Sequence, residues 1–202
     1  MKFVILPGFT MDRNHKDIIY LVYKLKENYP HATFRFLDPP VRPISIYNNQ
    51  RYRAWYDYYT DKRTSEEDIN ELQLLQSRER IHRILNSFKN LNDVYLLGYS
   101  QGCCTALDSG LTYPRKLGGI IGIKGHIPST TFHSLQTKQP IWVTHGKKDK
   151  TIGYNVAKQS YDKLLKNNYP LRFVTLPKAN HSLKSGINVQ LNDINHSLFK
   201  TT

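Results

Sequence analysis

Five residues near the middle of the chain, Gly98-Tyr99-Ser100-Gln101-Gly102, have the pattern G-x-S-x-G. An apolar run at 94–97 precedes them, and a helical pattern begins at Gln101. This order of strand, turn and helix displays a nucleophilic serine on a sharp turn, with glycines that let the strand and the helix approach closely. We therefore predict that Ser100 is a nucleophile. The alternative is a chance Gly-Ser turn with no catalytic role.

A serine hydroxyl needs a histidine that accepts its proton and a carboxylate that orients the histidine. Around a serine on such a turn, these groups follow along the chain in the order serine, acid, histidine. The acids between Ser100 and the late histidines are Asp108, Asp149 and Asp162. Asp108 and Asp162 lie within predicted helices, whereas Asp149 follows a predicted strand at 141–144. Because sites of parallel sheets form at the carboxyl ends of strands, we predict that Asp149 is the acid.

His181 is the predicted base among the eight histidines of the chain. It follows a predicted strand at 171–176, one strand after Asp149 and again at a carboxyl end. Five other histidines lie well before Asp149: His15, His31, His82, His126 and His133. His145 lies beside the acid and is interpreted as structural, and His196 falls in the last predicted helix. The alternative for His181 is a surface histidine in a loop.

The negative oxygen that forms during acyl transfer requires two hydrogen-bond donors. One is expected from the backbone N–H of Gln101, directly after the nucleophile, and the other from the loop after the first strand. That loop is Pro7-Gly8-Phe9-Thr10, so the N–H of Phe9 is the candidate. The alternative is a plain turn in which Phe9 only packs. This chemistry calls for no metal ion and no cofactor.

Apolar runs alternate with amphipathic ones along the whole chain, which predicts an α/β protein with a mostly parallel sheet. The predicted strands cover residues 3–6, 33–37, 94–97, 119–123, 141–144 and 171–176. The predicted helices cover 17–27, 65–88, 101–114, 155–166 and a tail from about 186. We expect a three-layer α/β/α sandwich that forms one domain over 1–202. Residues 38–64 and 124–139 are predicted to be long irregular loops.

The second predicted helix has its start signal at Thr64 or Ser65, because acidic residues at 66–68 would occupy its first turn. Helical spacing assigns most of its buried face to six residues: Ile69, Leu72, Leu75, Ile84, Leu85 and Phe88.

The net charge of +13, from 29 basic and 16 acidic residues, gathers after residue 101, where 14 basic residues face four acidic ones. Such a surface suits nucleic acid, an anionic membrane or acidic substrates. No nucleic-acid-binding motif accompanies it, so we disfavour nucleic acid and leave open a weak contact with an anionic membrane. No apolar run reaches the roughly 20 residues of a membrane span. The adjacent Cys103 and Cys104 cannot join distant segments, which favours the cytoplasm.

These residues resemble the small acyl-protein thioesterases and carboxylesterases of the α/β-hydrolase fold, the phospholipase/carboxylesterase family. The resemblance rests on four segments: 97–102 with the Ser-Gln elbow, Ala54-Trp55-Tyr56-Asp57, His145-Gly146 through Asp149, and Asn180-His181-Ser182. It implies a fold without a separate cap domain and an acyl-enzyme mechanism on an ester or thioester of a small molecule or an acylated protein.

The resemblance also implies the roles of the site residues, with Ser100, Asp149 and His181 as the triad and Phe9 and Gln101 as oxyanion donors. The chain departs from the family in having Pro7-Gly8 where the family has His-Gly, and bulkier cysteines after the elbow. Two other functions stay open: a lysophospholipase-like lipid esterase, and a non-catalytic module that binds an anionic partner through the basic half. The oligomeric state and the natural substrate are left open as well.

Overall fold

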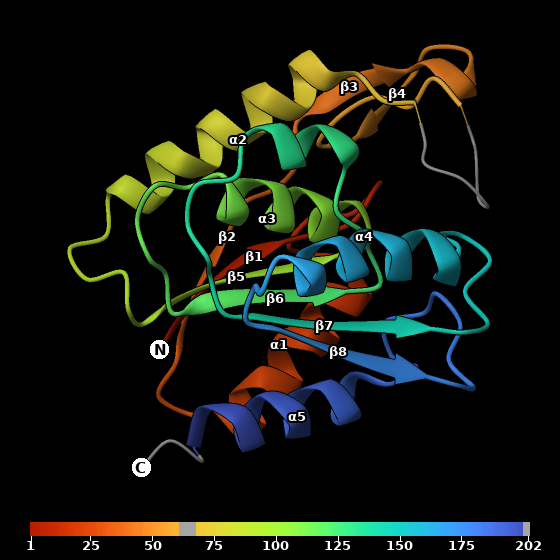
Figure 1. Ribbon diagram of the computed structural model, residues 1–202. Helices are drawn as coiled ribbons and strands as arrows, with labels where there is room; N and C mark the ends of the chain where they lie inside the picture. Colours follow the sequence, from red (N-terminus) through yellow and green to blue (C-terminus); the bar gives the residue numbers. More distant parts are fainter. Residues whose placement is uncertain (61–67, 200–202) are drawn as a thin grey trace.

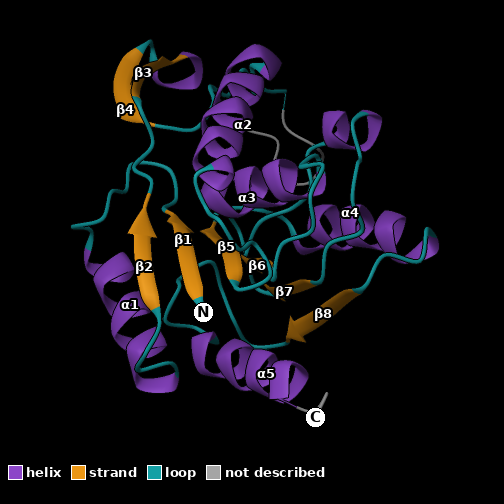
Figure 2. Ribbon diagram, turned by 90° about the vertical axis from the view of Figure 1, so that its left-hand side faces the viewer, coloured by secondary structure: helices purple, strands orange, loops and turns teal. Residues whose placement is uncertain are grey.

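The computed structural model describes residues 1–60 and 68–199. Within this part of the chain, six parallel strands form the main sheet in the order β2-β1-β5-β6-β7-β8 (Figures 1 and 2). The strands are β1 (Lys2–Leu6), β2 (Thr33–Phe36), β5 (Val94–Tyr99), β6 (Gly119–Ile123), β7 (Ile141–Gly146) and β8 (Leu171–Leu176). Each predicted strand is present. β1 starts one residue earlier than predicted, β2 ends one residue earlier, and β5 and β7 each end two residues later.

Helices cover both faces of this sheet (Figure 2). α1 (Lys16–Asn28) and α5 (Ile187–Phe199) lie on one face, and α2 (Glu71–Asn86), α3 (Gln101–Leu111) and α4 (Tyr154–Lys166) lie on the other. The expected three-layer α/β/α arrangement is therefore confirmed. No helix in the described ranges has the length and apolar character that crossing a membrane requires.

The alternation of side chains along β1 divides the interior into two cores. Phe3 and Ile5 pack in the core that α1 and α5 cover, whereas Val4 and Leu6 pack in the core under α2, α3 and α4. All four side chains are completely buried. Successive residues of a strand point to opposite faces, so an uninterrupted apolar run is what a sheet covered on both sides requires.

The segment predicted to be irregular at 38–64 contains a β-hairpin, so that prediction is wrong for its first half. β3 (Val41–Ile44) pairs antiparallel with β4 (Gln50–Arg53), and a 3₁₀ turn at Ser45–Tyr47 joins them. Four of the eight strand residues are exposed and only Ile44 is buried, so the strands lack the apolar alternation that reveals a half-buried strand. Residues 61–64 lie outside the described ranges.

The start of α2 also differs from the prediction. Its N-cap is Asn70, whose side chain accepts the N–H of Gln73 at 3.0 Å. The predicted cap at 64–65 lies outside the described residues, but Ile69 pairs with Tyr58 in an isolated bridge and so precedes the helix. Pairing across this bridge holds the chain extended up to Asn70.

The predicted buried face of α2 is right near the end of the helix, where Leu85 is buried and Ile84 packs against the core, and wrong near its start. Leu72 is 64% exposed and Leu75 is 41% exposed. The face that packs in the core consists of Leu74, Ser77, Ile81 and Leu85. Ser77 belongs to this face because its hydroxyl donates to the carbonyl of Trp55 at 2.6 Å. A buried polar side chain with its own partner therefore replaces an apolar one in the expected pattern.

Candidate active site

The sharp turn between β5 and α3 holds Ser100 in a strained backbone conformation, with φ 57° and ψ −125°. A side chain on Gly98 would lie 2.1 Å from the carbonyl oxygen of Gly102, and one on Gly102 would lie 2.1 Å from that of Leu6. Both glycines are therefore required by close backbone contacts. The N–H of Ser100 donates to the carbonyl of Ile123 at 2.9 Å, which fixes the turn against β6. A strained non-glycine residue held this firmly is typical of functional sites.

Ser100, His181 and Asp149 form one hydrogen-bonded chain at the carboxyl ends of β5, β8 and β7. The Ser100 hydroxyl donates to Nε2 of His181 at 2.8 Å. Nδ1–H of His181 donates to Oδ2 of Asp149 at 2.7 Å. The structure thus brings the three predicted side chains together, although 81 residues separate the serine from the histidine.

Asp149 is buried and its second oxygen is also bonded. Oδ1 accepts the backbone N–H of Thr151 at 2.9 Å and that of Ile152 at 3.0 Å. Burial by itself would raise the pKa of Asp149, but the hydrogen bond and charge of His181, together with the N–H of Ile152, outweigh burial and hold it below its ordinary value. The carboxylate is thus ionised at neutral pH and able to orient His181.

His145 lies directly behind this carboxylate. Its Nε2–H donates to the carbonyl of Ile152 at 2.9 Å and lies 3.4 Å from Oδ2 of Asp149. The side chain is fully buried, and burial lowers the pKa of His145, so it stays neutral. It supports the acid loop and has no contact with Ser100 in the described hydrogen bonds.

The acids that the sequence placed in helices are engaged elsewhere. Asp108 is completely buried, and both of its oxygens accept from Arg78, at 2.6 and 2.9 Å. Its Oδ1 also accepts the hydroxyl of Thr131 at 2.7 Å. Asp162 pairs with Lys158 one helical turn away on the exposed face of α4. Neither carboxylate takes part in the bonded chain around His181.

The loop after β1 brings the N–H of Phe9 to the same end of the sheet as Ser100. Gly8 packs against the elbow, since a side chain there would lie 3.2 Å from Cβ of Ser100. Thr10, at φ 64°, donates its N–H to the carbonyl of Arg53 at 2.8 Å, so β4 secures the loop. Within the described residues the N–H groups of Phe9 and Gln101 have no backbone acceptor. Neither N–H group is therefore engaged by the described backbone around it.

The side chain of Gln101 connects the elbow to the segment after β4. It is completely buried, accepts the N–H of Trp55 at 2.9 Å and donates to the carbonyl of Tyr56 at 2.8 Å. The indole of Trp55 in turn donates to the carbonyl of Pro7 at 2.8 Å. Two segments that sequence analysis treated as separate motifs thus form one buried network that includes the loop of Phe9.

Lys124 is a further site residue that the sequence analysis missed. It follows β6 with φ 54° and is buried, and its ammonium donates to the carbonyls of Ser182 and Ser185. Burial lowers the pKa of Lys124 to about 8, against an opposing attraction to Asp149. A lysine that ends an apolar strand is the sequence signal that could have identified it, because lysines are rarely buried. It secures the turn directly after His181.

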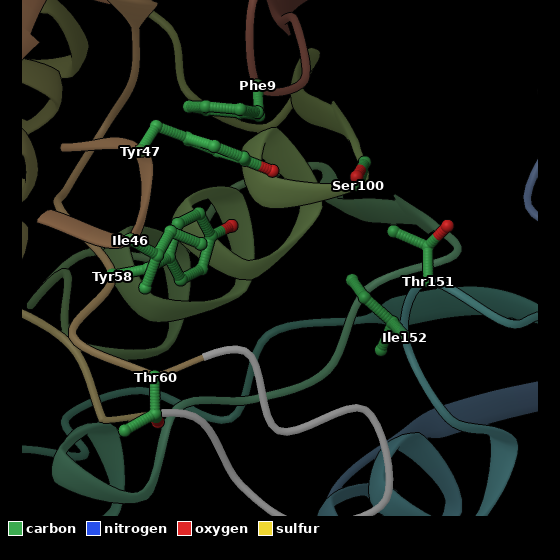
Figure 3. A pocket seen from close by; sticks show the side chains of 8 residues that line it. All are labelled: Phe9, Ile46, Tyr47, Tyr58, Thr60, Ser100, Thr151 and Ile152. Atoms are coloured by element: carbon green, nitrogen blue, oxygen red, sulfur yellow. The ribbon is translucent and has the colours of Figure 1, made fainter. Parts of the chain in front are cut away.

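An apolar pocket opens beside the Ser100 hydroxyl (Figure 3). Its volume is about 90 Å³. Its lining comes from the β1 loop, the hairpin, the segment after it, the turn of Ser100 and the acid loop: Phe9, Ile46, Tyr47, Tyr58, Thr60, Ser100, Thr151 and Ile152. The rings of Phe9 and Tyr47 stack at 5.8 Å between centroids. Phe9 and Tyr47 lie on one side of Ser100, and Thr151 and Ile152 lie on another.

The sequence matches a known protein family along most of its length, in addition to this geometry of Ser100, His181 and Asp149. The family model described as phospholipase/carboxylesterase matches residues 12–202. The chain belongs to the phospholipase/carboxylesterase family. The predictions of family membership and of a carboxylic ester hydrolase are thereby confirmed.

Relatives of this phospholipase/carboxylesterase family member include enzymes from fungi and plants. Acyl-protein thioesterase 1 of Schizosaccharomyces pombe is 31% identical over 169 residues, which cover 78% of this chain and 74% of that protein. Carboxylesterase SOBER1 of Arabidopsis thaliana is 26% identical over 164 residues, covering 77% and 72%. The crystal structure of SOBER1 matches with a TM-score of 0.80 at 22% identity, over 96% of this chain and 98% of that one. That likeness confirms the α/β-hydrolase fold.

Proposed function

We propose that this chain hydrolyses carboxylic esters or thioesters through an acyl-enzyme formed on Ser100, with His181 as the base and Asp149 as the orienting acid. The observation that supports this most directly is the unbroken hydrogen-bond chain from the Ser100 hydroxyl through His181 to Asp149, at 2.8 and 2.7 Å. Its position at a strained turn beside two free N–H groups matches the requirements of acyl transfer.

In the first half of the reaction, Oγ of Ser100 attacks the substrate carbonyl carbon while Nε2 of His181 accepts the hydroxyl proton. The carbonyl oxygen becomes an anion and accepts hydrogen bonds from the N–H groups of Phe9 and Gln101. When the tetrahedral intermediate collapses, the bond to the leaving group breaks, and His181 gives its proton to the departing oxygen or sulfur. The acyl group is then bound to Ser100.

In the second half, His181 removes a proton from water as the water oxygen attacks the acyl carbon. The same two N–H groups stabilise the second oxyanion, and Ser100 leaves as the protonated hydroxyl. The ionised Asp149 stabilises the His181 cation that forms in each half. No step requires a group other than these side chains, the two N–H groups and water.

The apolar pocket supports an assignment of the acyl group to the side of Phe9, Tyr47 and Ile152. The leaving group then points to solvent, which suits a small alcohol or thiol as well as an acylated side chain on a protein. The names of the relatives, acyl-protein thioesterase and carboxylesterase, favour the same substrate classes. A single domain over 1–202 and a cytoplasmic location stay predictions.

Labelling with a fluorophosphonate probe tests the proposal, because such a probe reacts only with an activated serine. We expect the wild-type chain to be labelled and to hydrolyse p-nitrophenyl acetate, and Ser100→Ala to lose both properties while its circular dichroism is unchanged. Ser134→Ala, in the loop before β7, is the matched control and should keep both. Wild-type labelling of Ser100→Ala, or no labelling of the wild type, would refute the assignment and favour the non-catalytic alternative.

A further inference from the structure

An open groove of about 460 Å³ lies between the β3–β4 hairpin and α2. Among the described residues its lining contains four arginines from three elements: Arg42 of β3, Arg53 of β4, and Arg80 and Arg83 of α2. The remaining lining consists of Asp38, Pro39, Pro40, Gln76 and Ser77. None of these residues lines the pocket beside Ser100, so the groove is separate from the candidate active site.

The positive charge of this arginine groove is not cancelled from within. Its one described carboxylate, Asp38, already accepts the backbone N–H of Arg13 at 2.9 Å and its Nε at 2.7 Å. Arg53 pairs with Asp12 at 3.3 Å, whereas in the part of the chain that the structure describes no carboxylate forms an ion pair with Arg42, Arg80 or Arg83. Such grouping of like charges is unfavourable unless an anion joins them.

Arg42 lines the groove with a partly buried guanidinium. Its Nε is buried and has no hydrogen-bond partner in the described residues. The nearby carboxylate of Asp57 accepts the N–H and the hydroxyl of Ser45 at 2.7 and 2.6 Å. Burial lowers the pKa of Arg42, the attraction of Asp57 opposes this, and repulsion from Arg80 adds to the lowering. Arg42 therefore contributes its positive charge to the groove, whereas its Nε, which has almost no accessible surface, is not open to a ligand there.

Among the described residues, the guanidinium of Arg80 has one acceptor, a backbone carbonyl, so that several of its N–H groups have no partner there. One Nη donates to the carbonyl of Asp38 at 2.9 Å, and the guanidinium carbon lies 5.9 Å from the ring centre of Trp55. Because a guanidinium has five donors, most of those of Arg80 remain for a ligand. A fixed, planar group with parallel N–H bonds matches two oxygens of a phosphate.

We propose that the arginine groove binds a phosphoryl group, either of a free phosphorylated small molecule or of a lipid headgroup. Arg42, Arg80 and Arg83 supply the charge and the N–H donors, and Arg53 borders the site from β4. The binding uses residues that the proposed hydrolysis does not, so either can fail without the other. The hairpin links the two sites physically, because its turn carries Ile46 and Tyr47 into the pocket beside Ser100.

Isothermal titration calorimetry of the full chain with pyrophosphate, at constant ionic strength, tests this site. We expect saturable binding to one site on the wild type and a loss of affinity of about tenfold or more in Arg42→Gln/Arg80→Gln, since hydrogen bonds to charged groups are among the strong ones. The matched control Arg35→Gln/Arg115→Gln removes the same charge elsewhere and should bind within about twofold of the wild type. Equal loss in both double variants overturns the proposal.

A vesicle assay distinguishes the two sources of the phosphoryl group, and a single variant replaces the double variant if that protein does not fold. Vesicles of phosphatidylcholine with and without phosphatidylinositol 4-phosphate are offered to the same variants in a sedimentation assay. Binding to pyrophosphate alone indicates a soluble ligand, and binding to the phosphorylated vesicles alone indicates a headgroup. If neither binds, the proposal is wrong. Should the double variant unfold, the exposed Arg83→Gln must weaken binding at least threefold, and an unchanged affinity overturns the assignment.

Discussion

The completely buried side chain of Gln101, directly after Ser100, accepts the backbone N–H of Trp55 at 2.9 Å. The same amide donates to the carbonyl of Tyr56 at 2.8 Å. Through this contact the elbow, the segment after the hairpin and the loop of Phe9 hold one another in place. The residue whose backbone N–H we propose as an oxyanion donor therefore also holds the surrounding segments together through its side chain.

Replacing Gln101 with alanine should destabilise the fold, because it leaves the N–H of Trp55 and the carbonyl of Tyr56 without partners. Each such buried group costs about 1–3 kcal/mol. Urea denaturation followed by circular dichroism measures the change in the free energy of unfolding. The control is Gln136→Ala, whose side chain is exposed, and it should lie within about 0.5 kcal/mol of the wild type. Equal stability of the two variants would contradict the prediction.

Asp149→Asn should retain the fold and lower kcat by roughly 10⁴-fold, because an amide favours the wrong tautomer of His181. Steady-state hydrolysis of p-nitrophenyl acetate measures the effect. Asp162→Asn, on the exposed face of α4, is the matched control and should keep the wild-type rate. A loss below about tenfold in Asp149→Asn would transfer the orienting role to another group.

The wild type and Asp149→Asn should also differ in how their stability depends on pH in acid. Because the pKa of Asp149 is held below its ordinary value, its contribution to the free energy of unfolding is complete above the ordinary pKa and is lost as the pH falls through the lowered one. The stability advantage of the wild type over Asp149→Asn should thus shrink below about pH 4. Thermal denaturation at a series of pH values measures it, and an advantage that grows toward acid pH would have the wrong sign.

Lys124→Met should lower kcat by about 10- to 100-fold with little change in KM, because the turn after His181 loses its two hydrogen bonds. The folded protein has a pKa of about 8 at Lys124, below the ordinary value of 10.5. Between these values the unfolded chain binds more protons, so the wild type gains stability as the pH rises. The variant lacks that gain. Denaturation of both proteins at pH 7 and pH 10 tests this sign, with the exposed Lys148→Met as the control.

Gly102→Ala should unfold or strongly destabilise the chain, since the new methyl would lie 2.1 Å and 2.3 Å from the carbonyl oxygens of Leu6 and Pro7. Overpacking of this kind costs about 1–3 kcal/mol or more. At Gly8 the nearest atoms would be 3.2 Å away, so Gly8→Ala should be the milder change. Thermal denaturation compares them. A Gly102→Ala protein as stable as Gly8→Ala would contradict the close contact.

Tyr47→Ala should shift the substrate preference toward longer acyl chains, because it removes the ring that stacks on Phe9 and closes the pocket beside Ser100. The ratio of kcat/KM for p-nitrophenyl butyrate to that for the acetate is the readout, and it should rise by about tenfold. Tyr23→Ala, on the exposed face of α1, is the control. If the ratio stays constant in Tyr47→Ala, the acyl group lies elsewhere.

Local signals in the sequence determined the strands of the main sheet, the elbow and the order of Ser100, Asp149 and His181. The apolar run of a buried strand and a serine between two glycines are both patterns of adjacent residues, so they are visible in the sequence without the fold. Asp149 followed from position alone, because its rivals Asp108 and Asp162 lay within predicted helices.

Tertiary structure alone decided the features that depend on partners far along the chain. The hairpin is stabilised by backbone pairing of polar strands, and the start of α2 is set by the bridge between Tyr58 and Ile69. The buried amide of Gln101, the ammonium of Lys124 and the arginine groove likewise acquire their roles from segments that meet only in the folded chain. Hydrogen bonds and charges act over a few ångströms of space, so sequence distance conceals them.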